Sequence, residues 1–275
     1  MNSPATGTPM TTVNNLLVTK STLLRDLQDL GITSGMTLIV HTSLSSLGWV
    51  CGGEQAVVEA LQQALGSEGT LVMPAHSAQL SEPARWKNPP VPEDWLETIR
   101  REMPAYDLRL TPTRAMGAVA ELFRSGEGVR RSSHPALSFA AWGSSRDNVV
   151  ESHSLDDGLG ESSPLARLYE LDAHILLLGV DHDKNTSLHL AEYRWNGSAT
   201  RRITESSPIL IDGQRRWVDY RDIDHDSGDF LAIGRAFEAT SDFNVGAVGK
   251  ATAKLLSLPE MVDFAVKWMD AHRTS

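Results

Sequence analysis

A strand–helix–strand pattern near the N-terminus is the strongest constraint on the fold. Residues 37–40 and 69–73 are short, continuously apolar segments, which is typical of strands buried on both faces. Between them, residues 54–65 carry apolar side chains at helical spacing, and Gly66 follows as a stop signal. A connection that contains a helix predicts parallel strands. The chain is therefore expected to be an α/β protein with functional side chains where its strands end.

A third apolar run, residues 175–178, gives way to polar residues and then to another helical pattern. Asn185 or Thr186 can cap this helix, so His189 is expected in its first turn. There the positive end of the helix dipole disfavours an imidazolium, which favours a neutral ring that accepts a proton. Glu192 follows on the same helix face. A neutral histidine beside a carboxylate suits a general base, although a lone histidine more often only packs the helix start.

Histidines follow all three predicted strands. His41 and His76 come directly after the first two, and His182 and His189 follow the third. Because the carboxyl ends of parallel strands meet at one edge of a sheet, we expect these rings to converge. His182, Asp183 and His189 could instead ligate a metal, but their spacing matches none of the usual zinc patterns. No metal is therefore expected.

The loop of residues 41–53 is rich in Ser, Thr and Gly and leads into a helix N-terminus. Its backbone amides and hydroxyls suit an anion such as a pyrophosphate. It has neither the Lys of a P-loop nor the spacing of a dinucleotide fingerprint, and an ordinary Gly-rich turn explains the composition equally well. Cys51 in this loop could carry an acyl group, but no His or Asp stands in a recognisable relation to it. An unreactive loop thiol is expected.

The rest of the chain continues to alternate helical and strand patterns. Helices are expected at residues 22–30, 93–102, 117–123, 165–171, 248–256 and 259–272, a strand at 137–141, and a hairpin at 209–220. Ser163 and Pro164 suit the start of the fourth helix, and Asp212 with Gly213 suits the hairpin turn. Together, the predicted helices and strands indicate an α/β fold with a mixed, largely parallel sheet flanked by helices.

Two segments stand outside this alternation. Residues 77–113 contain several prolines and two tryptophans, and such a long excursion is more often a wall or lid of a functional site than a linker. Residues 219–226 concentrate carboxylates directly after the hairpin. An acidic run is usually a solvated surface, but a histidine that needs an orienting carboxylate makes a substrate role credible.

Charge and cysteine content narrow the class of protein. Lys and Arg number 25 against 35 Asp and Glu, so the net charge of −10 argues against nucleic-acid binding and favours a cationic ligand. No apolar run is long enough to cross a membrane. Residues 1–15 lack signal-peptide features, and we interpret them as a flexible tail before one domain over residues 16–275. The single cysteine fits the reducing cytoplasm.

Several of these segments resemble the aminoglycoside N3-acetyltransferases, also called the antibiotic N-acetyltransferase family. Matching stretches include residues 41–50, 69–74, 111–117, 139–143, 176–192 and 248–251, and the run from Leu-Leu-Leu-Gly-Val to Leu-His-Leu-Ala-Glu is the most specific. The resemblance implies an α/β fold distinct from that of the commonest acetyltransferase superfamily. It also implies acetyl transfer from acetyl-CoA to the 3-amino group of 2-deoxystreptamine antibiotics, an activity that confers resistance.

The resemblance implies roles for individual residues as well. His189 is expected to act as the general base in a direct transfer, with Asp222 as the preferred carboxylate that orients its ring. Glu192 and Asp224 are expected on the substrate side, and His76 is placed with them by its position after the second strand. Contacts to acetyl-CoA are expected from Thr42, Ser43, Leu44, Ser45, Leu47, Gly48, Val50, Arg114, Met116 and Gly117.

Two alternatives remain open at the level of sequence. The same chemistry could act on another amine, such as a metabolite or a phosphonate-type antibiotic precursor. The chain could also be a non-catalytic protein that binds CoA or a cationic drug. Gln79 stands where many family members carry an acid, which affects the range of aminoglycosides more than the chemistry. The sequence leaves a homodimer open.

Overall fold

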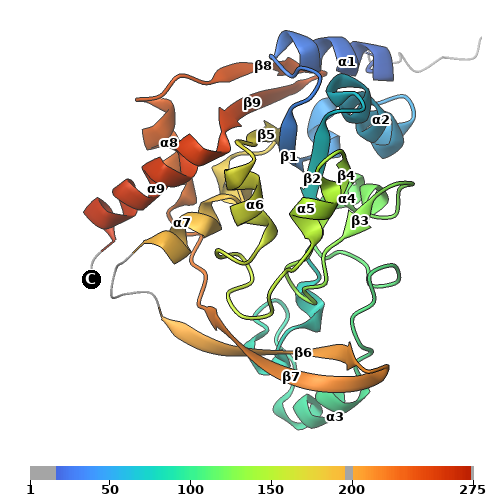
Figure 1. Cartoon of the computed structure of the whole chain (residues 1–275), viewed down its shortest axis with the longest axis vertical. Helices are drawn as coiled ribbons and strands as arrows, with labels where there is room; N and C mark the ends of the chain where they lie inside the picture. The colour runs from blue at the N-terminus through green and yellow to red at the C-terminus, as the bar shows by residue number, and fades with distance from the viewer. Residues whose placement is uncertain (1–16, 196–200, 274–275) are drawn as a thin grey trace, which may run out of the picture.

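The computed structural model describes residues 17–195 and 201–273, which form a seven-stranded sheet between two layers of helices and a separate two-stranded arm (Figure 1). The strands are β1 Thr37–Thr42, β2 Thr70–Pro74, β3 Arg130–Arg131, β4 Phe139–Gly143, β5 His174–Leu178, β6 Arg202–Ile211, β7 Gln214–Ile223, β8 Asn244–Val248 and β9 Ala251–Ser257. The α-helices are α1 Lys20–Asp29, α2 Gly53–Leu65, α3 Leu96–Glu102, α4 Gly117–Phe123, α5 Arg146–Val150, α6 Pro164–Glu170, α7 Leu188–Arg194, α8 Phe230–Glu238 and α9 Leu258–His272. The predicted tail, residues 1–15, lies outside the described residues.

The sheet has the order β3-β4-β2-β1-β5-β9-β8. Its three central strands are parallel, because β1 pairs in parallel with both β2 and β5. This confirms the crossover predicted from the strand–helix–strand pattern. The outer strands β4 and β9 run antiparallel to their inner neighbours. The predicted mixed sheet flanked by helices is therefore confirmed, and its parallel part is confined to the centre.

Alternation along β1 explains the two helical layers. Leu38 and Val40 pack on one face of the sheet against α1, α2 and α4, whereas Ile39 packs on the other face with helices α5 to α9. All three side chains are at most 2% exposed. Burial of an aliphatic side chain of this size contributes roughly 1.5–3 kcal/mol, so an uninterrupted apolar strand is stable only between two layers. The carboxyl ends of the central strands stay uncovered by these helices.

The arm is the hairpin of β6 and β7, which pair over their full length. Its turn uses Asp212 and Gly213 at φ of 51° and 73°, as the Asp-Gly signal predicted. The hairpin is longer than predicted, because β6 already begins at Arg202 and β7 continues to Ile223. Residues 219–223 of the expected acidic loop therefore belong to a strand.

The excursion of residues 77–113 packs against this arm, at the end of the molecule away from α1 (Figure 1). The amide of Tyr106 donates to the carbonyl of Pro208 at 2.8 Å, and Arg215 Nε donates to the carbonyl of Met103 at 2.6 Å. Trp86 Nε1 donates within the excursion to Ser81 at 3.0 Å. Excursion and arm therefore form one unit beside the uncovered strand ends.

Other predicted elements have mixed outcomes. The helix predicted at residues 248–256 is wrong, since Ala251–Ser257 is strand β9. Ala251, Ala253 and Leu255 are buried while Thr252 is exposed, so the apolar spacing that suggested a helix has the period of two of a strand. Helix α8 was not predicted. The helices expected at 22–30, 93–102, 117–123, 165–171 and 259–272 are confirmed, the second only in part, because residues 93–95 form a 3-10 turn before α3.

Helix α7 starts slightly later than the capping signals suggested. Its N-cap is Ser187, while Asn185 accepts a hydrogen bond from the amide of Ser187 at 3.2 Å. His189 is still in the first turn, as predicted. Within the part of the chain that the structure describes, no helix combines the length and apolar character needed to traverse a bilayer.

Candidate active site

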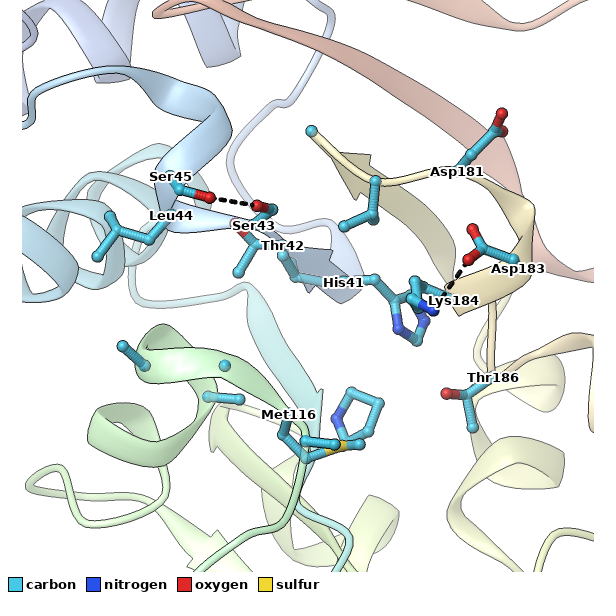
Figure 2. A pocket seen from close by; sticks show the side chains of 18 residues that line it. His41, Thr42, Ser43, Leu44, Ser45, Met116, Asp181, Asp183, Lys184 and Thr186 are labelled. Carbon is cyan, nitrogen blue, oxygen red and sulfur yellow. Dashed lines mark hydrogen bonds and ion pairs between the residues drawn. The ribbon is translucent and has the colours of Figure 1, made fainter. Parts of the chain in front are cut away.

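A cavity of about 590 Å³ opens where the central strands end (Figure 2). It lies between the end of β1, the segment before α4, and the turn after β5. The lining residues are Val40, His41, Thr42, Ser43, Leu44, Ser45, Pro74, Ala115, Met116, Gly117, Ala118, Ala120, Gly179, Val180, Asp181, Asp183, Lys184 and Thr186. The topology thus brings together three segments that are far apart in the sequence.

Six of the ten residues expected to contact acetyl-CoA line this cavity: Thr42, Ser43, Leu44, Ser45, Met116 and Gly117. The loop after β1 folds into a 3-10 turn over Leu44–Leu47. Its hydroxyls form a cluster, in which Ser43 Oγ lies 3.1 Å from Ser45 Oγ and 3.0 Å from Ser46 Oγ. Ser46 Oγ donates to the carbonyl of Gly179 at 3.0 Å and so fixes the loop to the end of β5.

The structure does not bring the other four residues, Leu47, Gly48, Val50 and Arg114, to this cavity. Leu47 and Val50 are buried in the core below α1 and α2, because the loop folds back between them. Gly48 lies against the aliphatic part of Lys250 at a φ of 88°. Arg114 lines a neighbouring cavity of about 290 Å³ that belongs to the excursion, together with Gln79. None of these four residues lines the cavity in which we expected contacts to acetyl-CoA.

His189 is half-buried and held at one ring nitrogen. Its Nδ1 lies 2.6 Å from Glu192 Oε2, one turn further along α7. The rings of His225 and Phe230 pack edge-on against it, with centroids 4.9 Å and 4.8 Å away. With Glu192 ionised, Nδ1 must donate the hydrogen bond, and the lone pair is then on Nε2. The neutral tautomer that this contact selects can accept a proton at Nε2.

Glu192 is buried, but both oxygens of its carboxylate have hydrogen-bond partners. Its Oε1 accepts from the amide of Asp226 and from Arg273 Nη1, both at 3.0 Å. Burial by itself would raise the pKa of Glu192, but the hydrogen bonds and charges of His189, Asp226 and Arg273 outweigh it and leave the pKa below its usual value. Glu192 is therefore the ionised partner of His189.

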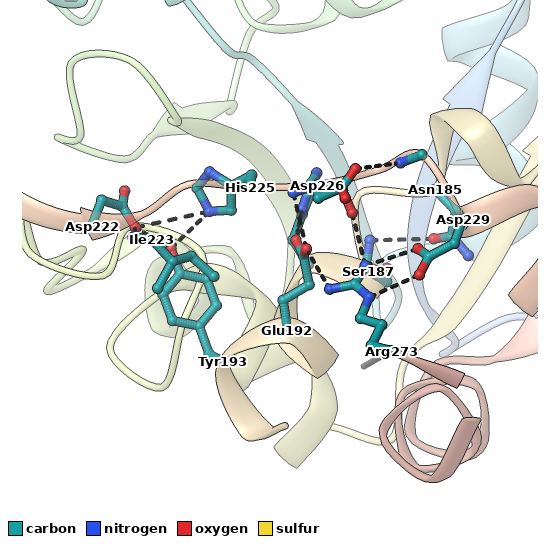
Figure 3. Close-up of polar contacts among 12 residues, drawn as sticks. Asn185, Ser187, Glu192, Tyr193, Asp222, Ile223, His225, Asp226, Asp229 and Arg273 are labelled. Atoms are coloured by element: carbon teal, nitrogen blue, oxygen red, sulfur yellow. Dashed lines mark hydrogen bonds and ion pairs between the residues drawn. The ribbon is translucent and has the colours of Figure 1, made fainter. Parts of the chain in front are cut away.

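The prediction that Asp222 orients His189 is wrong. Asp222 Oδ1 accepts from the hydroxyl of Tyr193 and from the amide of Ile223, and burial raises the pKa of Asp222 (Figure 3). The Tyr193 hydroxyl also lies 2.8 Å from His225 Nε2. Because β7 runs past the C-terminal half of α7, Asp222 meets Tyr193 there and not the ring in the first turn.

The buried histidines confirm that the strand ends converge. Burial, and next the electrostatic effect that His189 exerts when it is protonated, lower the pKa of His41 to about 3 and that of His76 to about 3. The same two causes lower the pKa of His225 to about 3. His76 also packs edge-on against Phe139 with ring centroids 5.3 Å apart. These rings are neutral at physiological pH and lie near His189, which is paired with Glu192.

His182 does not join this group. It is fully buried below α8, where its Nε2 lies 2.8 Å from Glu238 Oε1. Within the described residues, the set spaced closely enough to hold a metal is Asp181, His182 and Glu238, which does not include Asp183 or His189. Both carboxylates already accept from Lys254 Nζ, at 2.8 Å and 2.6 Å. The cluster is an ion-pair network around an ammonium group.

Asp224 is half exposed at the end of β7 and already has a cationic neighbour. Its Oδ1 lies 2.9 Å from Arg85 Nη2, and Arg85 Nε also lies 2.6 Å from Glu205 Oε1 on β6. Glu205 is mostly buried, its Oε2 has no partner among the described residues, and burial raises its pKa. Arg85 therefore pairs with two carboxylates on the wall that the excursion and the arm share.

Sequence reasoning missed Tyr193, Glu205, His225 and Arg273 as residues of this site. His225 lies inside the acidic run of residues 219–226, so its position could have been noticed. Arg273 is 81 residues from the carboxylate that it binds, and no local pattern indicates such a contact.

The chain is similar to known proteins over nearly its whole length. The model of the aminoglycoside 3-N-acetyltransferase family matches residues 39–270. The SPbeta prophage-derived aminoglycoside N(3')-acetyltransferase-like protein YokD of Bacillus subtilis is 48% identical over 251 residues, which cover 91% of this chain and 92% of that protein. Aminoglycoside N(3)-acetyltransferase VIII of Streptomyces fradiae is 35% identical, covering 92% of each chain.

Solved structures agree with these similarities. The crystal structure of YokD from Bacillus subtilis superposes with a TM-score of 0.91 at 46% identity, covering 94% of this chain and 96% of that one. AAC-VIa bound to sisomicin superposes at 0.86 with 30% identity, covering 94% and 100%. AAC-IIIb in a binary complex with CoASH superposes at 0.84 with 26% identity, covering 94% and 99%.

Proposed function

Because the chain belongs to the aminoglycoside 3-N-acetyltransferase family, we propose that it transfers the acetyl group of acetyl-CoA to the 3-amino group of a 2-deoxystreptamine aminoglycoside, and thereby confers resistance. The observation that carries the proposal is the hydrogen bond between His189 Nδ1 and Glu192, beside a cavity lined by hydroxyls. The exposed thiol of Cys51 is not among the residues lining that cavity. The reaction is therefore a direct transfer without an acyl-enzyme.

The proposed chemistry follows from the state of the ring. A substrate amine is protonated in water and must lose a proton before or during its attack on the thioester carbonyl. His189 Nε2 accepts that proton, and Glu192 stabilises the imidazolium that forms. The new C–N bond gives a tetrahedral oxyanion, which collapses with loss of the CoA thiolate. The thiolate takes up a proton, and the products are the acetamide and CoA.

The cavity after β1 supplies the proposed site for acetyl-CoA. Ser43 and Ser45 present hydroxyls there, and the backbone of the 3-10 turn offers amides that suit phosphate oxygens. Lys184 is the cation among its lining residues and lies 2.9 Å from Asp183. A relative solved in complex with CoASH supports CoA as the ligand. The proposal includes no metal, since the reaction needs none.

The wall formed by the excursion and the arm is the proposed site for the polycationic substrate. Arg85 holds Glu205 and Asp224 together, so a cation already fits between these two acids. We expect a substrate ammonium to compete with Arg85 for them. The sisomicin-bound relative supports an aminoglycoside in this role. The single cysteine and the supply of acetyl-CoA fit a cytoplasmic enzyme, which we propose as its location.

The test is an acetyl-CoA assay of the purified protein with a panel of aminoglycosides and simple diamines, which follows the released thiol. Acetylation of the 3-amino group of a 2-deoxystreptamine compound, located by NMR of the product, supports the proposal. Turnover of other amines only would show the same chemistry on a different substrate. Tight binding of CoA without thiol release from any amine would make the protein a binder and refute the enzyme proposal.

A further inference from the structure

Arg273, at the end of the last helix, reaches into the site from outside it. It is the C-cap of α9, and its side chain is only 14% exposed. Its Nη1 donates to Glu192 Oε1 at 3.0 Å, while Nε and Nη2 each donate to a carboxylate oxygen of Asp229 at 2.8 Å (Figure 3). Nη2 also donates to the carbonyl of Asp226 at 2.8 Å. The guanidinium is therefore fixed on several sides.

The two oxygens of Glu192 have separate partners. Oε2 binds the ring of His189, and Oε1 binds the amide of Asp226 and the guanidinium of Arg273. A buried carboxylate that lost Arg273 would keep one neutral donor and the imidazole. Its negative charge would then be balanced mainly by a proton on His189, which favours the imidazolium over the free base.

We propose that Arg273 is a positioning residue of this site. It holds Glu192 in the ionised form and in the orientation that presents a carboxylate to Nδ1, and its positive charge disfavours a second cation on the His189 ring. The proposal rests on the proposed function in one respect, namely that His189 acts as the base. The family match ends at residue 270, so Glu192 lies inside the matched region and Arg273 lies just beyond its end.

Other charged groups near the pair have to be considered. From the loop after β7, Asp226 contributes its amide to Glu192, and Asp229 is paired with Arg273 itself. His225, His41 and His76 face His189 with their pKa values lowered to about 3, so they are neutral across the range in which the reaction runs. Arg273 is thus the cation that binds Glu192 among the described residues, and replacing it changes the charge around His189 directly.

Helix α7 provides a matched control. Arg194 at its other end binds Glu161 with two hydrogen bonds, at 2.7 Å and 3.1 Å, and stacks on Tyr169. Its side chain is 23% exposed, so it resembles Arg273 in burial, while its partner Glu161 is 62% exposed. It does not contact Glu192. R194Q therefore removes an arginine–carboxylate pair that involves the same helix without touching the His189 pair.

The first experiment compares kcat and KM across pH for the wild type, R273Q, R273K and R194Q. For R273Q we expect the acidic limb of the kcat profile to move up by about one pH unit, because one full charge near the pair is lost, and kcat on that limb to fall by up to roughly ten-fold. The KM for acetyl-CoA should stay unchanged. R273K should keep the acidic limb of the wild type, and R194Q should match the wild type throughout. An R273Q profile that is merely scaled down, or the same shift in R194Q, would overturn the proposal.

A second measurement does not depend on activity. The ¹⁵N shifts of the imidazole nitrogens of His189, recorded over a pH series in the absence of substrate, report both protonation and tautomer. In R273Q the protonated ring should persist to higher pH than in the wild type. Identical curves would refute the role of Arg273, whereas failure of the wild type to acetylate any amine would refute only the proposed function. If R273Q does not fold, R273K carries the test: a displaced curve in this charged variant would contradict the proposal.

Discussion

The two nitrogens of the His189 ring have different surroundings. Nδ1 is committed to Glu192, while Nε2 carries the lone pair that the reaction needs. We expect H189A to fold and to bind acetyl-CoA, but to lose roughly 10²–10⁴ in turnover, as removal of a general base does. Thiol release and calorimetric CoA binding measure the two properties. C51S is the control and should remain active. A folded H189A enzyme with near-normal turnover would remove His189 from the mechanism.

Glu192, and not Asp222, is the carboxylate that contacts the ring of His189. E192Q leaves the ring without its anionic partner, so we expect kcat to fall on the order of 10²-fold. D222N should cost much less, because an amide oxygen still accepts from Tyr193 and from the amide of Ile223. Steady-state kinetics of both variants decide between them. A larger loss in D222N than in E192Q would return Asp222 to the role of orienting residue.

At the scale of elements, the wall that the excursion and the arm share has two acids, Glu205 and Asp224, that already pair with Arg85. Asp224 is 40% exposed, so its pair with a substrate ammonium should contribute under about 1 kcal/mol. We therefore expect D224N to raise the KM for an aminoglycoside by at most about five-fold and to leave the KM for acetyl-CoA unchanged.

A control for D224N is available at a carboxylate outside the arm. Asp147 pairs with Arg130 at 2.9 Å and is also partly exposed, but it lies on α5, outside the arm. D147N should leave both KM values unchanged. An equal rise of the aminoglycoside KM in D147N would mean that the overall charge of the protein, and not this wall, attracts the substrate.

At the scale of the whole molecule, the buried neutral histidines connect stability to pH. Burial lowers the pKa of His41 and His76 to about 3 and that of His153 to about 4. In the unfolded chain these rings take up protons near pH 6.5, so the unfolded state binds more protons below that pH. Their contribution to stability is complete above about pH 6.5 and is lost as the pH falls toward 3 or 4.

The expected result is a melting temperature that falls steadily between pH 7 and pH 5. Each ring contributes on the order of a few kcal/mol to this dependence. Thermal unfolding followed by circular dichroism at several pH values measures it, and replacing His153 by Gln should flatten the slope. His153 serves this purpose because it binds Ser132 and the carbonyl of Gly158, away from the proposed base. A melting temperature that is constant across this range would contradict the prediction.

Features that depend on neighbouring residues could be predicted from the sequence alone. The parallel central strands, the first-turn position of His189 and the turn at Asp212 follow from periodicity, capping and turn preferences, which act over a few residues. Segment 251–257 shows the limit of this reasoning, because its small apolar side chains fit both periods until the neighbouring strand β5 selects one. The cavity at a sheet edge and six of its lining residues could also be anticipated, whereas the lining residues from the turn after β5 could not.

Helical spacing places Glu192 beside His189, but the other groups around this pair were decided only by the tertiary structure. Asp222 is on strand β7, opposite Ile203, and its carboxylate accepts from Tyr193 on α7. Arg273 meets Glu192 because α7 and α9 pack together in the same layer. Contacts between residues that are far apart in the sequence depend on how whole elements pack, and that packing cannot be predicted from the local sequence.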